Sequence, residues 1–274
     1  MGQKSNIITL RKSYKNLNFS NLNKNIFFFG LNFSKAFKQL LLKKRVIVVK
    51  DCINIEGNKL FLKLDLFFRT LKIKVYRRKN LIDNDATKKK LLVNNTKNTL
   101  NKLLTYYYSK FKINSVYTQV SVLNKFNKHL FKYLAKKLKH FSSVLFKRRL
   151  GLFIDFIKLT LFYVQGKVDL NVYCLVLSDI FKFLQKKLHA KFLTLIKTVF
   201  LLLINDKKFK NVISGAKFSI NGRFKGKTRS SSTFLQLGSV SNQSLSKEID
   251  FAKIHIFTKK MGVFGLKLWV QKNN

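Results

Sequence analysis

The residue types that most often carry enzyme or metal chemistry are few and scattered in this chain. Its four histidines are His129, His140, His189 and His255. None of them forms a metal or catalytic pattern with a cysteine, and Cys52 and Cys174 form no CxxC pair of the kind that zinc sites use. The 11 acidic residues are too dispersed for a carboxylate pair, and no Walker loop, dinucleotide GxGxxG or HExxH motif occurs. We therefore expect no enzymatic activity, catalytic residue, resident metal or cofactor, and we interpret the histidines and cysteines as packing or solvated groups.

Positive charge is the chemistry that the sequence does offer. Lys plus Arg number 56 against 11 Asp plus Glu, which gives a formal net charge of +45. A compact chain with that charge repels itself, so we expect it to be bound to a polyanion. The 28 Phe and 9 Tyr argue against a highly charged disordered chain, because disorder goes with few aromatic residues. The composition therefore disfavours an ordinary soluble metabolic enzyme.

Two segments concentrate the positive charge. Residues 1–50 hold 11 Lys or Arg and no acidic residue, which predicts a basic N-terminal arm. Nine basic and no acidic residues lie from Lys207 to Lys247, around the run Arg223-Phe-Lys-Gly-Lys-Thr-Arg229. Gly222 and Gly226 would let the backbone approach a partner closely. We interpret this run as a positive loop on a small sheet that contacts phosphates.

Hydrophobic periodicity predicts the elements that position these charges. Apolar or alternating runs at 46–49, 60–66 and 71–76 are typical of strands, with a turn over residues 56–59 between the first two. Residues 77–112 are interpreted as a lysine-rich linker or insertion. Leucines at helical spacing over 128–150 predict a helix with Lys and Arg on its other side. The clearest helix is predicted over 178–204, with Ser178 as its N-cap.

The last 70 residues predict a small sheet. Residues 217–222, 252–258 and 264–270 alternate apolar and polar, and a serine-rich loop is expected after Arg229. The formal GxxG at 262–265 is interpreted as a structural turn and not as the nucleotide-clamping loop of KH domains.

No stable membrane insertion is expected. The longest apolar stretches, 150–164 and 192–204, are interrupted by charged residues. They fall short of the roughly 18–20 uninterrupted apolar residues that a membrane-spanning helix needs. We expect them to be buried core segments.

Several blocks follow one another in an order that is known from a protein family. Gly215-Ala216-Lys217, then Asn221-Gly222-Arg223 with Gly226 and Arg229, match a GAK…SGRLGGxxxAR pattern. Residues 248–252 match ADIDY, and residues 262–270 match a GxxGxKVWI ending. The opening Met1-Gly2-Gln3-Lys4 with Arg11 matches MGQK…R, and 172–200 fits the element that precedes the C-terminal domain. With these blocks the chain resembles small-subunit ribosomal protein three, the universal KH-containing ribosomal family.

The resemblance implies an α+β fold with three parts. These are a basic N-terminal arm at 1–45, a KH-like (type II) central domain with a lysine-rich insertion at 46–176, and a C-terminal small α/β sheet domain at 177–274. The KH-like domain is expected to be degenerate, since no glycine occurs between Gly57 and Gly151, where its GxxG loop would lie.

The resemblance also implies which residues contact RNA. The expected rRNA-binding residues are Lys4, Arg11, Lys217, Arg223, Lys225, Lys227, Arg229, Lys259, Lys260 and Lys267. The expected mRNA-channel residues are Lys186, Lys187 and Lys191. Phe192 and Leu195 stand where further basic residues would be expected, which sets this chain apart from the family pattern.

These features predict a structural constituent of the mitochondrial ribosome small subunit, bound to small-subunit rRNA in the head near the channel through which mRNA enters. Its expected partners are small-subunit rRNA, mRNA and neighbouring small-subunit ribosomal proteins. The absence of Pro and the excess of Phe indicate an AT-rich genome, so we expect an organelle-encoded protein of the mitochondrial matrix. Two alternatives stay open: a free organellar RNA-binding protein, and a basic protein on a membrane surface.

Overall fold

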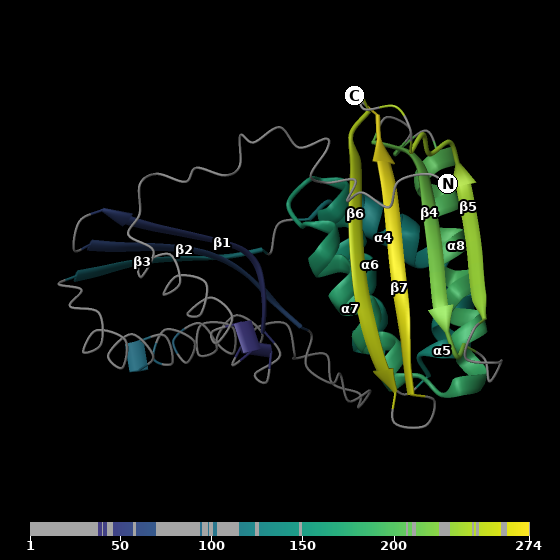
Figure 1. The fold of residues 1–274 in the computed structure, drawn as a ribbon, viewed down its shortest axis with the longest axis horizontal. Helices are drawn as coiled ribbons and strands as arrows, with labels where there is room; N and C mark the ends of the chain where they lie inside the picture. The colour runs from purple at the N-terminus through teal and green to yellow at the C-terminus, as the bar shows by residue number, and fades with distance from the viewer. Residues whose placement is uncertain are drawn as a thin grey trace. The chain divides into compact units, whose positions relative to one another are not determined.

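The computed structural model describes residues 38–39, 41–42, 46–56, 59–69, 94, 98, 101–102, 115–123, 126–147, 150–206, 208–209, 212–224, 231–242, 244, 247–258 and 262–273. These residues contain five α-helices and two β-sheets, so the fold is mixed α+β (Figure 1). Two compact units divide the chain, one within residues 20–125 and one within residues 126–274.

The unit within residues 20–125 contains a three-stranded sheet. Its strands are β1 (Val46–Glu56), β2 (Lys59–Phe68) and β3 (Ser115–Val122), in the order β1-β2-β3. β1 and β2 are antiparallel and place Glu56 opposite Lys59, which confirms the two predicted strands and their turn. β3 runs parallel to β2 and was not predicted, although Val116, Thr118, Val120 and Val122 alternate in it. The run at 71–76 lies outside the described residues.

The unit within residues 126–274 is built on a four-stranded antiparallel sheet. Its strands are β4 (Ile213–Gly222), β5 (Ser232–Gly238), β6 (Ile249–Thr258) and β7 (Gly262–Lys272), in the order β5-β4-β7-β6. The three predicted C-terminal strands are therefore confirmed as β4, β6 and β7. The serine-rich segment after Arg229 is not all loop, because part of it forms β5 and pairs with β4.

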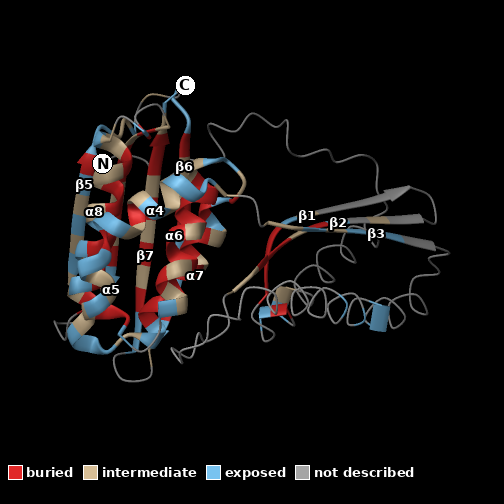
Figure 2. Cartoon of the chain, turned by 180° about the vertical axis from the view of Figure 1, so that it is seen from behind, coloured by how far each residue is buried: buried red, intermediate tan, exposed pale blue. Residues whose placement is uncertain are grey.

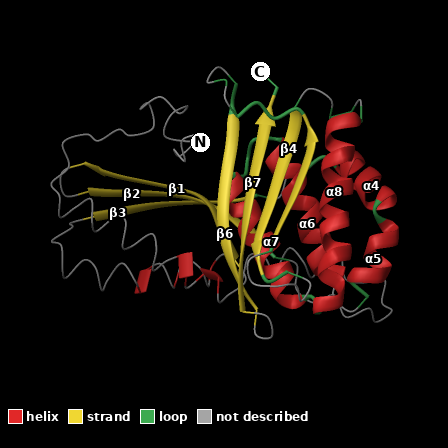
Figure 3. Ribbon diagram, turned by 45° about the vertical axis from the view of Figure 1, so that its right-hand side comes forward, coloured by secondary structure: helices red, strands yellow, loops and turns green. Residues whose placement is uncertain are grey.

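The described helices lie on one face of this sheet (Figures 1 and 3). They are α4 (Lys128–Lys137), α5 (Lys139–Leu145), α6 (Leu150–Val164), α7 (Leu170–Phe183) and α8 (His189–Asn205), with a short 3₁₀ turn, η2 (Lys186–Leu188), before α8. α7 packs on β6, α8 packs on β4 and β5, and α6 packs on α7. The core is the layer between helices and sheet, where buried positions gather (Figure 2).

Aromatic rings fill much of this core. Phe192 of α8 lies 4.7 Å from Phe181 of α7 between ring centroids, and Phe200 lies 5.0 Å from Phe218 of β4. All four rings are at most 1% exposed. Edge-to-face pairs of this kind add to the hydrophobic stabilisation that the burial itself provides. The excess of Phe in the sequence is thus used for packing.

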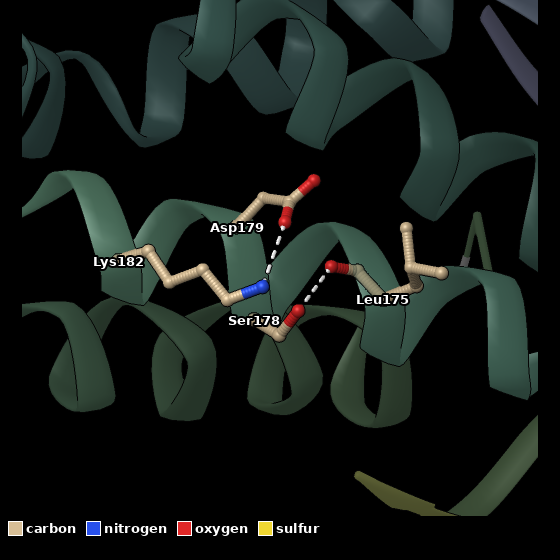
Figure 4. Close-up of polar contacts among 4 residues, drawn as sticks. All are labelled: Leu175, Ser178, Asp179 and Lys182. Carbon is tan, nitrogen blue, oxygen red and sulfur yellow. Dashed lines mark hydrogen bonds and ion pairs between the residues drawn. The ribbon is translucent and has the colours of Figure 1, made fainter. Parts of the chain in front are cut away.

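The helix predicted over 178–204 is in fact two helices. Ser178 lies inside α7 and its hydroxyl donates to the Leu175 carbonyl at 2.7 Å, so the predicted N-cap is wrong (Figure 4). The chain leaves helical geometry at Leu184 and resumes it through η2. The predicted boundary between residues 176 and 177 falls within α7.

The helix predicted over 128–150 is also divided. α4 ends at Lys137 and α5 starts at Lys139, with Leu138 between them. Asn127 is the actual N-cap of α4, since its side chain accepts from the backbone N–H of His129 and Leu130. The predicted apolar stripe still faces inward, as Leu134 and Leu138 are fully buried.

The segment Lys186–Asn205 contains an 18-residue window with a mean hydropathy of 1.5, of which 39% is buried, and could cross a membrane by length and composition alone. In this structure the apolar stripe of that segment packs on β4 and β5, with Phe192, Leu195 and Phe200 buried. Such packing is typical of a core helix.

The GxxG at 262–265 starts a strand. Gly262 and Gly265 both lie in β7, and Gly262 pairs with Thr258 where β6 connects to β7, so the predicted turn runs directly into the strand. Gly262 has a φ of +80°, a conformation that favours glycine.

Candidate nucleic-acid interface

The four-stranded sheet has a second face that none of the described helices covers. Side chains alternate along a strand, and Phe218, Leu266 and Leu268 point toward the helices and are buried. Their neighbours point away from the helices. This open sheet face comprises Lys217, Ser219, Asn221, Ser232, Phe234, Gln236, Phe251, Lys253, His255, Phe257, Val263, Lys267 and Trp269. It holds three lysines and, among these residues, no acidic side chain.

Lys217 is held at the centre of the open sheet face by aromatic rings. Its Nζ lies 4.8 Å from the centroid of the Phe234 ring and 5.4 Å from that of Trp269. An ammonium group within about 6 Å of a ring is attracted by the negative charge of the ring face. Phe251 packs against Trp269 with centroids 5.2 Å apart. These contacts position the Lys217 cation without neutralising it.

Lys267 belongs to the same group of charges. It lies opposite Ser219 on the neighbouring strand, so it is a diagonal neighbour of Lys217. Lys253 lies opposite Lys267 on β6 and is exposed. Like charges on adjacent strands repel. This row is therefore best stabilised by a negatively charged partner.

A second group of cations gathers where α7, η2 and β4 end. This junction surface consists of Lys186, Lys187, Lys191 and Arg223, all exposed. Arg223 follows Gly222, whose φ of +120° favours glycine and where an added Cβ would lie only 3.1 Å from the Val263 carbonyl oxygen. The hydroxyl of Ser231 donates to the Gly222 carbonyl at 2.9 Å. Gly222 thus sets the direction in which the chain continues from β4 to Arg223 and Phe224.

His189 connects the two parts of the junction surface. It directly follows η2, and its ring stacks on Phe224, the residue after Arg223, with centroids 6.1 Å apart. Its Nε2 lies 3.0 Å from the Phe181 carbonyl oxygen and 3.2 Å from that of Leu184, which fixes the break between α7 and α8. Burial lowers the pKa of His189 by disfavouring the charged ring, against the opposing effect of the two carbonyl contacts. A neutral His189 therefore anchors both cationic segments to the core.

α8 supplies only part of the basic surface that the resemblance implies. Lys191 is exposed on its first turn, whereas Phe192 and Leu195 are 0% exposed and belong to the core. Further basic residues at those two positions would be buried in this fold. On α8 and η2, the cations of the junction surface are accordingly Lys186, Lys187 and Lys191.

The edge of the sheet is tied to the helices by one carboxylate. Asp250 accepts a hydrogen bond from the Tyr163 hydroxyl at 3.2 Å and lies 2.7 Å from Lys272 Nζ. Burial, and then the nearby Asp250 charge, raise the pKa of Tyr163 well above its ordinary value. Asp250 is thus engaged on the helix side of β6 and does not reduce the positive charge of the open sheet face.

Six of the 13 predicted contact residues lie in the described part of the chain. The structure brings Lys217 and Lys267 together on the open sheet face, and it brings Arg223, Lys186, Lys187 and Lys191 to the junction surface. The others, Lys4, Arg11, Lys225, Lys227, Arg229, Lys259 and Lys260, lie outside the described residues. The described members of the predicted set thus form two cationic surfaces on one structural unit.

The predictions missed the aromatic half of the open sheet face. Phe234, Phe251, Phe257 and Trp269 were not recognised as candidate contact residues, and neither was Lys253. Four of these residues could have been placed on the open sheet face from the alternation in β6 and β7: Phe251, Lys253, Phe257 and Trp269. Phe234 could not be found in this way, because the serine-rich segment that precedes it is typical of a loop.

Chemistry beyond ionic binding has little support in the described part of the chain. Within it, no group of three or more His, Cys, Asp or Glu side chains is placed to hold a metal ion. Cys174 is buried, and burial raises the pKa of its thiol to about 12, so it is a packing group rather than a reactive thiolate. The side chain of Cys52 lies outside the described residues. No protein-family model matches the chain, and no curated protein matches it at a significant score.

Proposed function

We propose that this chain is a structural constituent of the mitochondrial small ribosomal subunit. In this proposal it binds the small-subunit rRNA in the head, beside the channel through which mRNA enters, and acts without catalysis. Its surroundings would be rRNA, mRNA and neighbouring small-subunit proteins of the mitochondrial matrix.

The observation that carries the proposal is where the sequence blocks lie in the fold. The block at 215–223 forms β4, the block at 248–252 starts β6, and the block at 262–270 forms β7. β4, β7 and β6 are adjacent strands of one sheet. Blocks that resemble one family in sequence thus form one structural unit, and they carry Lys217, Arg223 and Lys267.

Binding in this proposal is electrostatic and positional. Lysine and arginine side chains neutralise phosphates of folded rRNA, while the sheet fixes their spacing. Of the acidic side chains near these surfaces, Asp250 already pairs with Lys272 and Asp179 with Lys182, at 2.7 and 3.4 Å. The cations of the two surfaces are therefore available to phosphates.

The central part of the chain has a place in the same proposal. The three-stranded sheet within residues 20–125 would be part of the degenerate type II KH-like domain with insertions that is expected over 46–176. A GxxG clamp is absent from this stretch of the sequence, so we propose that it acts as a scaffold.

The mRNA contacts are proposed for Lys186, Lys187 and Lys191. They would line the channel with three ammonium groups. Since Phe192 and Leu195 are buried, the helix cannot add further cations at those positions. We propose that this chain contacts mRNA here but lacks the larger basic cluster that the family pattern implies.

Quantitative mass spectrometry of organellar small subunits tests the proposal. The subunits are purified on a high-salt gradient, and the copies of this chain are counted against other small-subunit proteins. One copy per subunit after the salt wash is the expected result. Recovery of the chain in the light fractions, with the subunits intact, would contradict the proposal and favour a free RNA-binding protein. Flotation with anionic liposomes after ribonuclease treatment would favour the membrane-surface alternative.

A further inference from the structure

The open sheet face exposes two phenylalanine rings that the fold does not need. Phe234 on β5 is 59% exposed and Phe257 on β6 is 66% exposed. Each lies on an outer strand of the four-stranded sheet. The buried aromatic residues on the helix side are at most a few per cent exposed, so these two rings are not part of that core.

Two of the three lysines, Lys253 and Lys267, lie in the same row across the strands as Phe234, and Lys217 lies in the next row, on the side away from Phe257. Phe234 is level with Ser219, Lys267 and Lys253 across the strands, and Phe257 lies four residues beyond Lys253 along β6. With strands about 4.8 Å apart and a rise of about 3.3 Å per residue, the two rings are roughly 20 Å apart along a diagonal. A strand of a few unpaired nucleotides can span that diagonal.

The charges and rings of the open sheet face favour unpaired nucleotides over an apolar protein partner. An apolar protein partner would have to bury Lys217, Lys253 and Lys267 without an acid from this face, at a high desolvation cost. Unpaired nucleotides bring a phosphate for each cation and a base for each ring. Four-stranded sheets that expose aromatic rings bind single-stranded RNA by stacking bases on those rings. A duplex cannot stack in this way, because its bases are already stacked on one another.

We infer that the open sheet face binds unpaired nucleotides of RNA, with bases stacked on Phe234 and Phe257 and phosphates on Lys217, Lys253 and Lys267. This inference rests on the proposed function and makes it more specific. It assigns the face to single-stranded rRNA or mRNA, while the junction surface binds phosphates whether or not the bases are paired. Lys217 leaves its ring contacts far enough to meet a phosphate, and the ring faces that it vacates accept a base.

The single tryptophan of the chain provides the probe. Trp269 is its only tryptophan, and its ring contacts Lys217 Nζ, as the Phe234 ring does from two strands away. The full-length protein is titrated with an oligouridine of about ten nucleotides and, separately, with an RNA duplex of equal length, while Trp269 emission and fluorescence anisotropy of the RNA are recorded. The oligouridine is expected to quench Trp269, and the duplex is expected to bind without quenching.

Substitutions test whether the rings of Phe234 and Phe257 bind the bases. Phe234→Ala and Phe257→Ala are each expected to weaken oligouridine binding by about 5- to 100-fold and to leave duplex binding unchanged. Val263→Ala, which shortens an apolar side chain that is 47% exposed on the same face, is the matched control and should bind like the wild type. Because all three side chains are exposed, these variants are expected to fold, which near-ultraviolet circular dichroism checks.

Two results would overturn the inference. One is oligouridine binding without Trp269 quenching, and the other is wild-type oligouridine affinity in both phenylalanine variants. Either would leave the proposed function intact as long as the chain stays in salt-washed subunits, and would assign the face to a protein neighbour. Failure of the proposed function gives a different pattern, in which the chain is absent from those subunits whatever the fluorescence shows.

Discussion

The carboxylate of Asp250 links three elements of the fold. It joins β6 to Tyr163 of α6 and to Lys272 of β7, at 3.2 and 2.7 Å. We expect Asp250→Asn to lower the free energy of unfolding by about 1–2 kcal/mol, because the hydrogen bond from Tyr163 loses its charged acceptor and the ion pair with Lys272 is lost. Urea unfolding measures this. The control is Lys182→Gln, which removes an exposed ion pair with Asp179 and should change stability by less than about 0.5 kcal/mol. Equal stability of Asp250→Asn and wild type would show that the network does not hold the edge of the sheet.

The lowered pKa of His189 predicts that the free energy of unfolding depends on pH. Its pKa in the folded chain lies below the ordinary 6.5, so the unfolded chain takes up a proton at a pH at which the folded chain does not. The free energy of unfolding should therefore fall as pH decreases from about 7 toward 5. In His189→Gln this part of the slope should be smaller, whereas His140→Gln, at an exposed position, should keep it. Identical slopes in all three proteins would contradict the assignment.

At the scale of elements, the main role of α8 is to pack in the core, and only its first turn contributes a cation to the junction surface. Phe192 lies 4.7 Å from Phe181 and 6.1 Å from Phe156 between ring centroids. Phe192→Ala should lower the free energy of unfolding by about 3–5 kcal/mol through loss of packing and the cavity left behind. Phe192→Lys, which restores the type of residue that the resemblance implies, should be worse, since it buries an unpaired charge.

The neighbouring residue provides the control for that series. Lys191→Ala removes an exposed side chain and should change stability by less than about 0.5 kcal/mol. Chemical unfolding of the three variants checks the order. A stable Phe192→Lys protein would mean that this part of α8 faces a partner and not the core.

The elements show which sequence signals were sufficient. Alternation placed β4, β6 and β7 correctly, because each strand has one buried face and one open face. The same rule did not find β5, whose Ser232 and the preceding Ser231 resemble loop residues and whose pairing with β4 is set by tertiary contacts. The break between α7 and α8 had no marker either, since the chain contains no proline and Leu184 and Leu188 continue the helical stripe. Only the contact of His189 with two carbonyl oxygens explains it.

For the candidate site, the sequence predicted the cations but not what surrounds them. Lys217, Lys267 and Arg223 were found by charge and by the ordered blocks. Their aromatic neighbours Phe234 and Trp269 depend on the register between β5, β4 and β7, which local patterns do not determine.

At the scale of the whole molecule, the net charge of +45 dominates. Ion pairs join Lys38 to Asp51, Lys182 to Asp179 and Lys272 to Asp250, and most basic side chains in the described part of the chain face solvent. Such a surface is stabilised by polyanion binding, which weakens as salt concentration rises. In the unit within residues 126–274, aromatic side chains therefore pack between the helices and the sheet, while basic side chains face solvent.

The most direct test of this account is ultraviolet cross-linking of rRNA to the chain in purified small subunits, with mass spectrometry of the cross-linked peptides. The account predicts small-subunit rRNA attached to peptides from β4, β6 and β7. Subunits that contain the chain but yield cross-links solely within residues 20–125 would contradict the claim that the sheet of the C-terminal unit is the RNA-binding surface.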